Sequence, residues 1–389
     1  MQVDYTLTKE QEDLKRRAHE FAMTFKPFIA EWDAENRCPM DEVTNAARKH
    51  GLLGITMPKA YGGQDLTVMD YVIAHEEVSR YAWATLSEAL FSTSGPGPSV
   101  CLRSDNEAVK KKFLVDIISG KKRCAITMTE PKYGSNVDDL QTMAEEKSDH
   151  FVVNGSKRFI TGACDNELYS TFVRFNNIPG SRGIGALMIE AGTPGVTILA
   201  GPTFIGARGM NHGELFFENA IVPKENLMFR EGSFGRIMEC FNMERLHNAT
   251  FCLANAEAAL DEALKYTQTR KAFGKYICEF QAVYQDLAEM ATMIEAARGL
   301  TYSAACTAVD GKFPKLMETA YAKTFANATV QKVTQMAMIL HGGDGTTTNF
   351  PIQRIWRDAM AGGTVAGGAP AILRNMIAGK LLNRKLDQH

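Results

Sequence analysis

Residues 150–162 read HFVVNGSKRFITG, and this stretch decides how the chain is divided. Apolar and β-branched residues flank Asn154 and Gly155 on both sides. An Asn-Gly dipeptide between two such runs favours the two-residue turn that joins antiparallel strands. The sequence therefore predicts a β-hairpin centred on Asn154 and Gly155.

Similar short segments lie before and after this stretch. They are rich in Val, Ile, Phe and Thr and are separated by turn residues: RCAITMTEP at 123–131, LYSTFVRF at 168–175, GIGALMIEA at 183–191, GVTILA at 195–200 and GELFFENAIV at 213–222. No helix of useful length fits between them, which favours antiparallel β structure over βαβ units. We therefore predict a central β domain at 121–230.

Helical patterns flank this domain. Thr8 followed by Gln11 is the glutamine form of a capping box and predicts a helix start. Residues 70–91 carry apolar side chains at helical spacing, and 236–270 contain neither Gly nor Pro. Within the latter segment Leu and Ala recur on one stripe: Leu246, Ala249, Leu253, Ala256, Leu260 and Leu264.

Further helices are predicted in 279–310 and 313–340, and a last one starts near Pro370. The predicted fold class is therefore α+β and multidomain. An N-terminal helical domain at 1–120 and the β domain at 121–230 precede a C-terminal helical bundle at 231–389.

Composition excludes several functional classes. A net charge of −2 gives no electrostatic case for nucleic acid or an anionic membrane as partner. The eight cysteines form no C-x-x-C pair, the histidines show no metal-ligand spacing, and neither familiar phosphate-binding loop occurs. We expect no metal site. The N-terminus lacks the apolar stretch of a signal peptide, so we expect a cytoplasmic protein.

Four motifs resemble those of the acyl-CoA dehydrogenase family. CAITMTEPKYGSN at 124–136 resembles TEP-x-x-GS-[DN], and VVNGSKRFITG at 152–162 resembles NG-x-K-x-WIT-[NG]. TRKAFGKYICEFQ at 269–281 resembles R-x-x-FG-x-x-I-x-x-FQ, and 341–359 resembles GG-x-G…P…RDA. The four occur in the family's order, with matching lengths between them.

This resemblance implies an N-terminal helical domain, a central antiparallel β-barrel-like domain and a C-terminal four-helix bundle. It implies an FAD-dependent enzyme of fatty acid metabolism that dehydrogenates an acyl-CoA thioester, or reduces the enoyl-CoA in reverse. A carboxylate takes the α-proton, and flavin N5 takes the β-hydride. The usual electron acceptor is an electron-transfer flavoprotein, and the usual assembly is a homotetramer.

The residue that takes the proton departs from the common family pattern. Many members carry the base as the glutamate of IYEGTSEIQ, whereas this chain reads VAGGAPAIL and has Gly367 in that position. A known family variation places the base on the first bundle helix, directly before an arginine. Here that position is Glu244, followed by Arg245. The resemblance therefore implies Glu244 as the catalytic base.

Helix geometry bears on Glu244 independently of the family. It lies two residues from Leu246, hence about 200° around the helix from the leucine stripe, which by itself indicates a solvated glutamate. Its own face, however, is not a solvent face and carries Ile237, Phe241, Asn248 and Phe251. A carboxylate in such surroundings is a candidate for a raised pKa and a functional role.

The resemblance also implies the residues that bind the cofactor and the ester. At the flavin ring these are Met128, Thr129, Ser135, Phe159 (in place of the usual tryptophan) and Thr161. At the dinucleotide of a neighbouring subunit they are Arg270, Phe273, Gln281, Gly342 and Gly343. The ester-binding residues are Ser135, Phe241 and Arg245. Ile339 replaces a frequent glutamine, which puts one contact to the dinucleotide in doubt.

The segment 79–95 bears on the acyl group. Trp83 favours a short or compact acyl chain. Some relatives that act on anionic acyl groups carry an arginine in its second half, where this chain has Leu86, Ser87 and Glu88, so anionic tails are disfavoured. Glu88 either accepts a cationic tail such as a betaine or is a surface glutamate, and we favour the surface position.

Two alternative functions remain open. One is a non-oxidising enzyme on the same scaffold, desulfinase-like, which the C-terminal loop resembles. The resemblance implies that such relatives lack a carboxylate at both base positions, whereas this chain keeps Glu244. The other is a non-catalytic partner subunit of a hetero-oligomer, which the loss of the loop glutamate favours and the retained flavin motifs oppose.

Overall fold

The computed structural model describes residues 6–309 and 311–386. The N-terminal part is helical: α1 (Lys9–Phe25), α2 (Ile29–Glu35), α3 (Met40–Lys49), α4 (Val68–Ala82), α5 (Glu88–Ser94), α6 (Pro96–Arg103) and α7 (Glu107–Ile118). The predicted capping box is present at the start of α1. The backbone N–H of Gln11 donates to Thr8 Oγ1 over 3.3 Å, and the backbone N–H of Thr8 donates to Gln11 Oε1 over 3.1 Å. Trp83–Ser87 forms a π-helical segment between α4 and α5.

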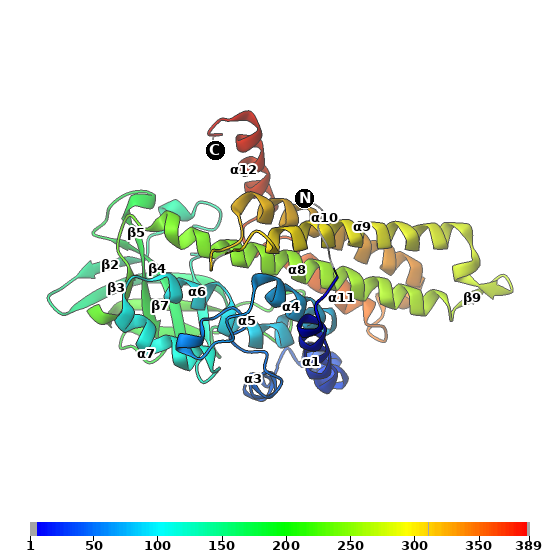
Figure 1. Cartoon of the computed structure of the whole chain (residues 1–389), viewed down its shortest axis with the longest axis horizontal. Coiled ribbons are helices and arrows are strands. Elements are labelled where there is room, and N and C mark those ends of the chain that lie inside the picture. The colour runs from blue at the N-terminus through cyan, green and yellow to red at the C-terminus, as the bar shows by residue number, and fades with distance from the viewer. Residues whose placement is uncertain (1–5, 310, 387–389) are drawn as a thin grey trace.

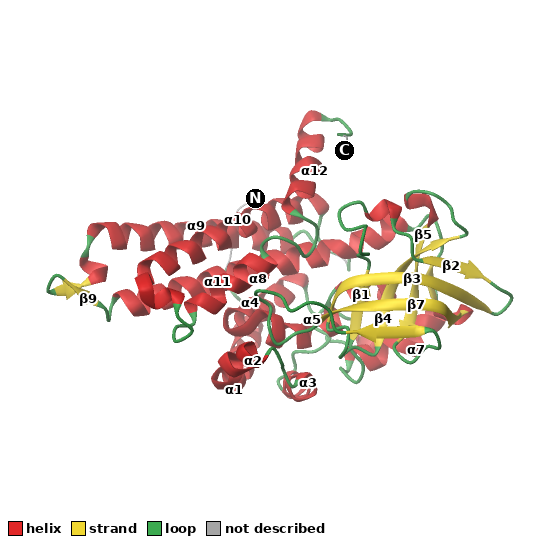
Figure 2. Ribbon diagram, turned by 180° about the vertical axis from the view of Figure 1, so that it is seen from behind, coloured by secondary structure: helices red, strands yellow, loops and turns green. Residues whose placement is uncertain are grey.

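The central part is a sheet that the helices flank (Figure 2). Its strands are β1 (Cys124–Thr127), β2 (Met143–Glu146), β3 (His150–Thr161), β4 (Leu168–Phe175), β5 (Ile184–Glu190), β6 (Val196–Leu199), β7 (His212–Pro223) and β8 (Leu227–Phe229). The order is β6-β7-β3-β2-β4-β5-β8, with β1 beside β4. The predicted fold class is confirmed, but the sheet does not close into a barrel, and β4 pairs in parallel with β1 and β2.

The hairpin predicted at Asn154-Gly155 is wrong. β3 runs through both residues and pairs with β7 on either side of them, with a register shift between Val153 and Gly155. Gly155 has φ +144°, and a Cβ built there would lie 2.6 Å from Thr142 Cα. The glycine therefore allows an irregularity where the strand passes close to its neighbour, rather than a chain reversal.

The C-terminal part is a bundle of long helices: α8 (Phe234–Thr267), α9 (Gln281–Ala305), α10 (Leu316–His341) and α11 (Ile352–Gly362). A small hairpin, β9 (Lys271–Ala272) and β10 (Lys275–Tyr276), joins α8 to α9 at the end of the bundle far from the sheet (Figure 1). Helix α12 (Pro370–Leu382) projects from the bundle in both views.

Short 3-10 turns connect these elements: Lys26–Phe28, Lys59–Tyr61, Val137–Asp139, Ser181–Gly183, Lys224–Asn226, Ile277–Glu279 and Gly342–Thr346. Among the described residues, none of the helices is long and apolar enough to cross a membrane.

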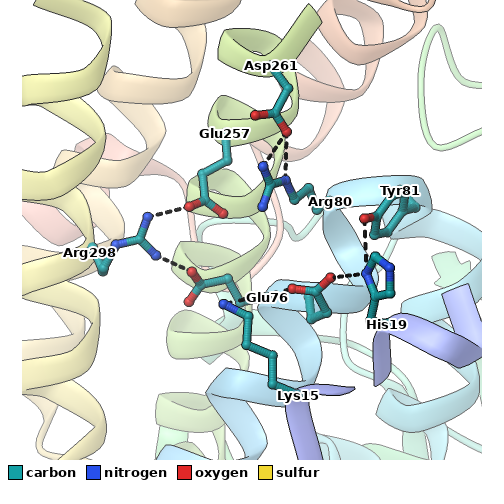
Figure 3. Close-up of polar contacts among 9 residues, drawn as sticks. Lys15, His19, Glu76, Arg80, Tyr81, Glu257, Asp261 and Arg298 are labelled. Carbon is teal, nitrogen blue, oxygen red and sulfur yellow. Dashed lines mark hydrogen bonds and ion pairs between the residues drawn. The ribbon is translucent and has the colours of Figure 1, made fainter. Parts of the chain in front are cut away.

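Charged side chains tie the N-terminal helices to the bundle (Figure 3). Arg298 of α9 binds both Glu76 of α4 and Glu257 of α8. One turn further along α4, Arg80 donates from Nε to Asp261 of α8 over 2.8 Å. Because Arg298 bridges two carboxylates on different helices, it fixes the α4–α8 contact on which the site described below depends.

Candidate active site

Glu244 lies within α8, and its side chain is largely enclosed. The predicted neighbours on its helix face are all buried: Ile237, Phe241, Asn248 and Phe251. Its Oε2 atom has no hydrogen-bond partner among the described residues. Burial raises the pKa of Glu244 to about 7, against the opposing charges of Lys323 and Arg245. A carboxyl group with such a pKa is available as a base near neutral pH.

The glycine-rich loop meets α8 at Gly367. This residue has φ +69°, and a Cβ built on it would lie 3.2 Å from Arg245 Cα and 3.2 Å from Lys323 Cε. A side chain here would have to displace either the helix backbone or a buried lysine. The loop position without a proton-accepting group is therefore adjacent to the helix segment that carries Glu244.

Lys323 of α10 is a residue that sequence reasoning missed. Its side chain is fully buried, and its Nζ donates to Asn327 Oδ1 over 2.7 Å. The signal was present in the sequence, because Lys323 shares a helical stripe with Ala320, Ala326 and Val330, all of which are buried. A lysine on an apolar stripe is a candidate for a function near a partner charge.

Buried polar rings also belong to this region. Tyr71 of α4 and His247 of α8 are hydrogen-bonded through Oη and Nδ1 at 3.1 Å, and the His75 ring lies 4.7 Å from that of His247. Burial lowers the pKa of His247 to about 3 and that of His75 well below its ordinary value. Both rings are therefore neutral at physiological pH.

Glu88 is not at the surface, so the prediction that we favoured is wrong. It is 9% exposed, and burial together with the charge of Glu244 raises its pKa to about 8. Arg123 opposes this shift. The π-helical segment Trp83–Ser87 has wider turns than an α-helix, so it rotates Glu88 away from the face that uniform helical spacing predicts.

The residues expected at the flavin ring gather at the end of β1 and along β3. Met128 and Thr129 follow β1 and are partly exposed, and Ser135 is exposed. A buried ion pair supports this segment: Lys157 Nζ lies 2.8 Å from Glu130 Oε1 and also donates to the Met128 carbonyl over 3.2 Å. The Lys157 side chain therefore joins the TEP and NG-x-K motifs, which are also linked by a backbone hydrogen bond of 2.9 Å from the Arg158 amide to the Thr129 carbonyl.

Phe159 and Thr161 lie near the end of β3. Phe159 is 44% exposed with φ +59°, and its ring lies under the Arg158 guanidinium at 4.7 Å. An exposed aromatic ring in left-handed backbone geometry is unfavourable without a ligand to cover it. Gly134 adds open backbone, since a Cβ there would meet nothing within 4 Å. These features fit a planar aromatic cofactor.

The second group of predicted cofactor residues lies at the opposite end of the molecule (Figure 1). Arg270 and Gln281 are exposed on either side of the β9–β10 hairpin, and Phe273 at its tip is 96% exposed. Gly342 and Gly343 are exposed at the end of α10, where Ile339 is 66% exposed. One subunit therefore does not bring the two groups of cofactor residues together.

The predicted ester-binding residues differ in their surroundings. Arg245 is buried, and its Nη1 donates to Asn242 Oδ1 over 2.7 Å, while its Nε lacks a partner among the described residues. Phe241 packs edge-on against Phe172 of β4 and so contributes to the core between sheet and bundle. Arg245 thus has donor capacity left for a ligand, whereas Phe241 also has a packing role.

Trp83 packs against α8 close to the end of α11. Its ring stacks on Phe251 at 3.9 Å, and a Cβ built on Gly362 would lie 2.1 Å from Phe251 Cε1. The two aromatic rings therefore fill the space between the π-helical segment and the glycine-rich end of α11.

Three family models match the chain in series. They describe the N-terminal, middle and C-terminal domains of acyl-CoA dehydrogenases and match residues 8–121, 125–220 and 233–382. The structure of butyryl-CoA dehydrogenase from Megasphaera elsdenii is similar, with a TM-score of 0.93 and 33% identity, covering 98% of this chain and 100% of that one.

Two curated relatives have different chemistries. The 3-sulfinopropanoyl-CoA desulfinase of Cupriavidus necator is 33% identical over 99% of this chain and 98% of its own length. The CarC subunit of the caffeyl-CoA reductase-Etf complex of Acetobacterium woodii is 33% identical over 88% of this chain and 90% of its own length. The matches cover nearly the whole chain, and the chain belongs to the acyl-CoA dehydrogenase family, an FAD-dependent family of flavoprotein enzymes.

Proposed function

We propose that the protein catalyses FAD-dependent α,β-dehydrogenation of a short or compact acyl-CoA thioester, or the reverse enoyl-CoA reduction, with Glu244 as the base. The observation that carries this proposal is the enclosed Glu244 carboxyl beside the loop position that Gly367 leaves without a proton acceptor. The raised pKa of Glu244 supports it, because a base must be available in its charged form near neutral pH.

Each residue has a distinct part in this reaction. Glu244 takes the α-proton, and its position on a helix held by α4, α9 and α10 fixes the direction of approach. Arg245 offers its unpartnered Nε to the ester channel. The chemistry that FAD supplies is acceptance of the β-hydride at N5. Met128, Thr129, Ser135, Phe159 and Thr161 hold its ring.

The separation of the two proposed cofactor-binding groups supports a homo-oligomer. The hairpin residues Arg270 and Phe273, together with Gln281, lie far from β1 and β3 of the same subunit (Figure 1). Arginine suits a diphosphate through its planar donor fork. We propose that these residues and the backbone at Gly342 and Gly343 contact the dinucleotide bound by neighbouring subunits, most simply in a tetramer.

The proposed electron partner is an electron-transfer flavoprotein, since one relative is named as a subunit of a complex with Etf. We place the reaction in the cytoplasm and in fatty acid metabolism. The desulfinase-like alternative ranks lower because Glu244 is present and enclosed. The non-catalytic subunit ranks lower because the exposed Phe159 ring and the unobstructed backbone at Gly134 still fit a cofactor.

The test is an anaerobic titration of the purified protein with short, branched and cyclic acyl-CoAs, followed by visible absorption. We expect at least one compact ester to bleach the flavin band. An intact band with every ester would turn the proposal towards enoyl-CoA reduction or non-redox chemistry, and protein without flavin would favour the partner-subunit alternative.

The rate of flavin reduction is expected to rise with pH through about 7. Burial raises the pKa of Glu244 to that value, and only the ionised form accepts the α-proton. Below the midpoint the second-order rate constant should fall about tenfold per pH unit. Stopped-flow measurements at ester concentrations well below saturation give this second-order rate constant, and its pH dependence reports the pKa of the base in the free enzyme. A flat profile between pH 5.5 and 8.5, values chosen as roughly 1.5 units either side of that pKa, would exclude Glu244 as the titrating base.

Acyl groups with an anionic tail are expected to react poorly. Glu88 and Glu244 are two buried carboxyl groups that interact. Electrostatic repulsion of a third carboxylate, on the acyl tail, should lower the reaction rate of that ester by roughly 100-fold. The ratio of kcat/KM for valeryl-CoA to that for glutaryl-CoA should widen above pH 8, where Glu88 ionises. Glu88→Gln should remove this pH-dependent part. An unchanged ratio in the variant would show that Glu88 does not contact the acyl tail.

A further inference from the structure

Lys323 is a buried cation without a buried carboxylate bonded to it. Its side chain has no exposed surface, and among the described residues it forms no ion pair within 4.0 Å. The ammonium is instead bonded to Asn327 Oδ1, at 2.7 Å. Burying an ammonium group is unfavourable unless it is compensated, so the position requires a reason.

A chain of amide side chains fixes this lysine relative to α8 and α11. Asn327 Nδ2 donates to Asn248 Oδ1 over 2.8 Å, and Asn248 Nδ2 donates to the Gly362 carbonyl over 2.8 Å. Asn248 lies one helical turn after Glu244 on the same face. The hydrogen bonds therefore link the lysine to the helix that carries the base and to the end of α11 that leads into the glycine-rich loop.

The other side of Lys323 meets the loop itself. A Cβ at Gly367 would lie 3.2 Å from Lys323 Cε and 3.3 Å from the Arg245 backbone nitrogen. The side chain of Lys323, the loop at Gly367 and the α8 backbone directly after Glu244 are therefore in mutual proximity. A side chain at position 367 would therefore press on both the lysine and the helix backbone.

Charged and titratable groups on four helices interact with Glu244. Arg245 stands on α8, Lys323 on α10, Glu88 on α5 and Tyr71 on α4. Of the two cations, Lys323 opposes the rise in the pKa of Glu244 more strongly than Arg245 does. Each of these cations also donates one hydrogen bond to an asparagine, Arg245 to Asn242 and Lys323 to Asn327, so the order of their effects on Glu244 marks Lys323 as the principal cation for the carboxylate.

We propose that Lys323 is a positioning residue for proton abstraction: held by Asn327, which in turn is bonded to Asn248, its ammonium keeps the Glu244 carboxylate ionised. The inference rests on the proposed role of Glu244. In the step itself the Cα–H bond of the acyl group breaks and the proton passes to the Glu244 carboxylate. Lys323 retains its own protons and does not touch the ester.

The test compares Lys323→Met with Lys323→Arg in the FAD-loaded enzyme. Lys332→Met is the matched control, because Lys332 lies on the same helix and is half exposed. We expect Lys323→Met to raise the midpoint of the pH profile for flavin reduction by at least about one unit. A shift of one unit lowers the ionised fraction of Glu244 at pH 7 by about fivefold, so the rate at pH 7 should fall by at least about that factor, and the loss should largely disappear at high pH. Lys323→Arg and Lys332→Met should keep the original midpoint.

A second readout does not depend on turnover. Infrared difference spectra recorded during a pH titration report the protonated carboxyl band, and the band absent from Glu244→Gln identifies that of Glu244. Its midpoint should shift upward in Lys323→Met. If no acyl-CoA reduces the flavin and no enoyl-CoA reoxidises the reduced flavin, the proposed function fails, while this titration still tests the lysine.

Asn327→Asp guards against a variant that does not fold. It keeps the size of the side chain and places a carboxylate on the ammonium, so it should raise the Glu244 midpoint in the same direction. Unchanged midpoints in Lys323→Met and Asn327→Asp would overturn the proposal. So would a shift in Lys323→Arg as large as in Lys323→Met, because the lysine would then act through packing rather than charge.

Discussion

Glu244→Gln is expected to slow reduction of the bound flavin by roughly 10³-fold at pH 8, within the range that loss of a general base produces. Glutamine keeps the size of the side chain and its place among Phe241, Asn248 and Lys323, so the change removes only the proton acceptor. The measurement is a single-turnover stopped-flow trace with the ester that bleaches the wild type.

Binding must stay intact for this result to be interpreted. FAD content should be unchanged because the residues that we assign to the cofactor lie outside α8, and the affinity for a non-reducing CoA thioether should be unchanged because glutamine has the size of glutamate. Glu239→Gln is the matched control: Glu239 lies on the same helix but is exposed and pairs with Arg103 at 3.4 Å. Near-normal reduction in Glu244→Gln would remove Glu244 from the mechanism.

The order of helices, sheet and helices was predictable because it follows from local periodicity. The capping box at Thr8 and Gln11 forms within four residues, and the buried face of Glu244 follows from the 3.6-residue turn of a straight, uninterrupted helix. In such segments neighbouring residues alone decide the outcome.

Predictions failed where distant residues or irregular geometry decide. Asn154 does not adopt positive φ, which the predicted two-residue turn requires at both positions, because β3 pairs with β7 through this point. Glu88 follows a π-helical segment that changes the helical phase. The apolar stripe around Lys323 indicates that it is buried, but its approach to Gly367 depends on where the loop between α11 and α12 lies against α10, which local sequence does not decide.

The ion pair between Lys157 and Glu130 was also hidden in the sequence, although both residues belong to motifs that were recognised. The Lys157 side chain is fully buried, and Glu130 accepts further hydrogen bonds from the backbone amides of Gln141 at 2.7 Å and Thr142 at 2.9 Å. Burial would raise the pKa of Glu130, but Lys157 and these donors outweigh it and hold the pKa below its ordinary value. The contribution of the ionised Glu130 carboxylate to the free energy of unfolding is therefore present at neutral pH and is lost as the pH falls below the usual carboxyl range.

Lys157→Met should lower the free energy of unfolding by roughly 3–5 kcal/mol, because it leaves the Glu130 carboxylate buried without its counter-ion. The double variant Lys157→Met, Glu130→Gln should lose less than the sum of the two single variants, since no unpaired charge remains. Urea unfolding followed by circular dichroism measures both. Lys147→Met is the control, because Lys147 pairs with Glu145 at the surface and should change stability by less than about 1 kcal/mol.

The same variant should also loosen the cofactor. Lys157 donates to the Met128 carbonyl, so its loss frees the segment that follows β1, where Met128 and Thr129 are assigned to the flavin ring. We expect the fraction of purified Lys157→Met protein that retains FAD to fall, while Lys147→Met retains it fully. Equal FAD retention in both, with lower stability in Lys157→Met alone, would mean that the ion pair supports the sheet but not the cofactor edge.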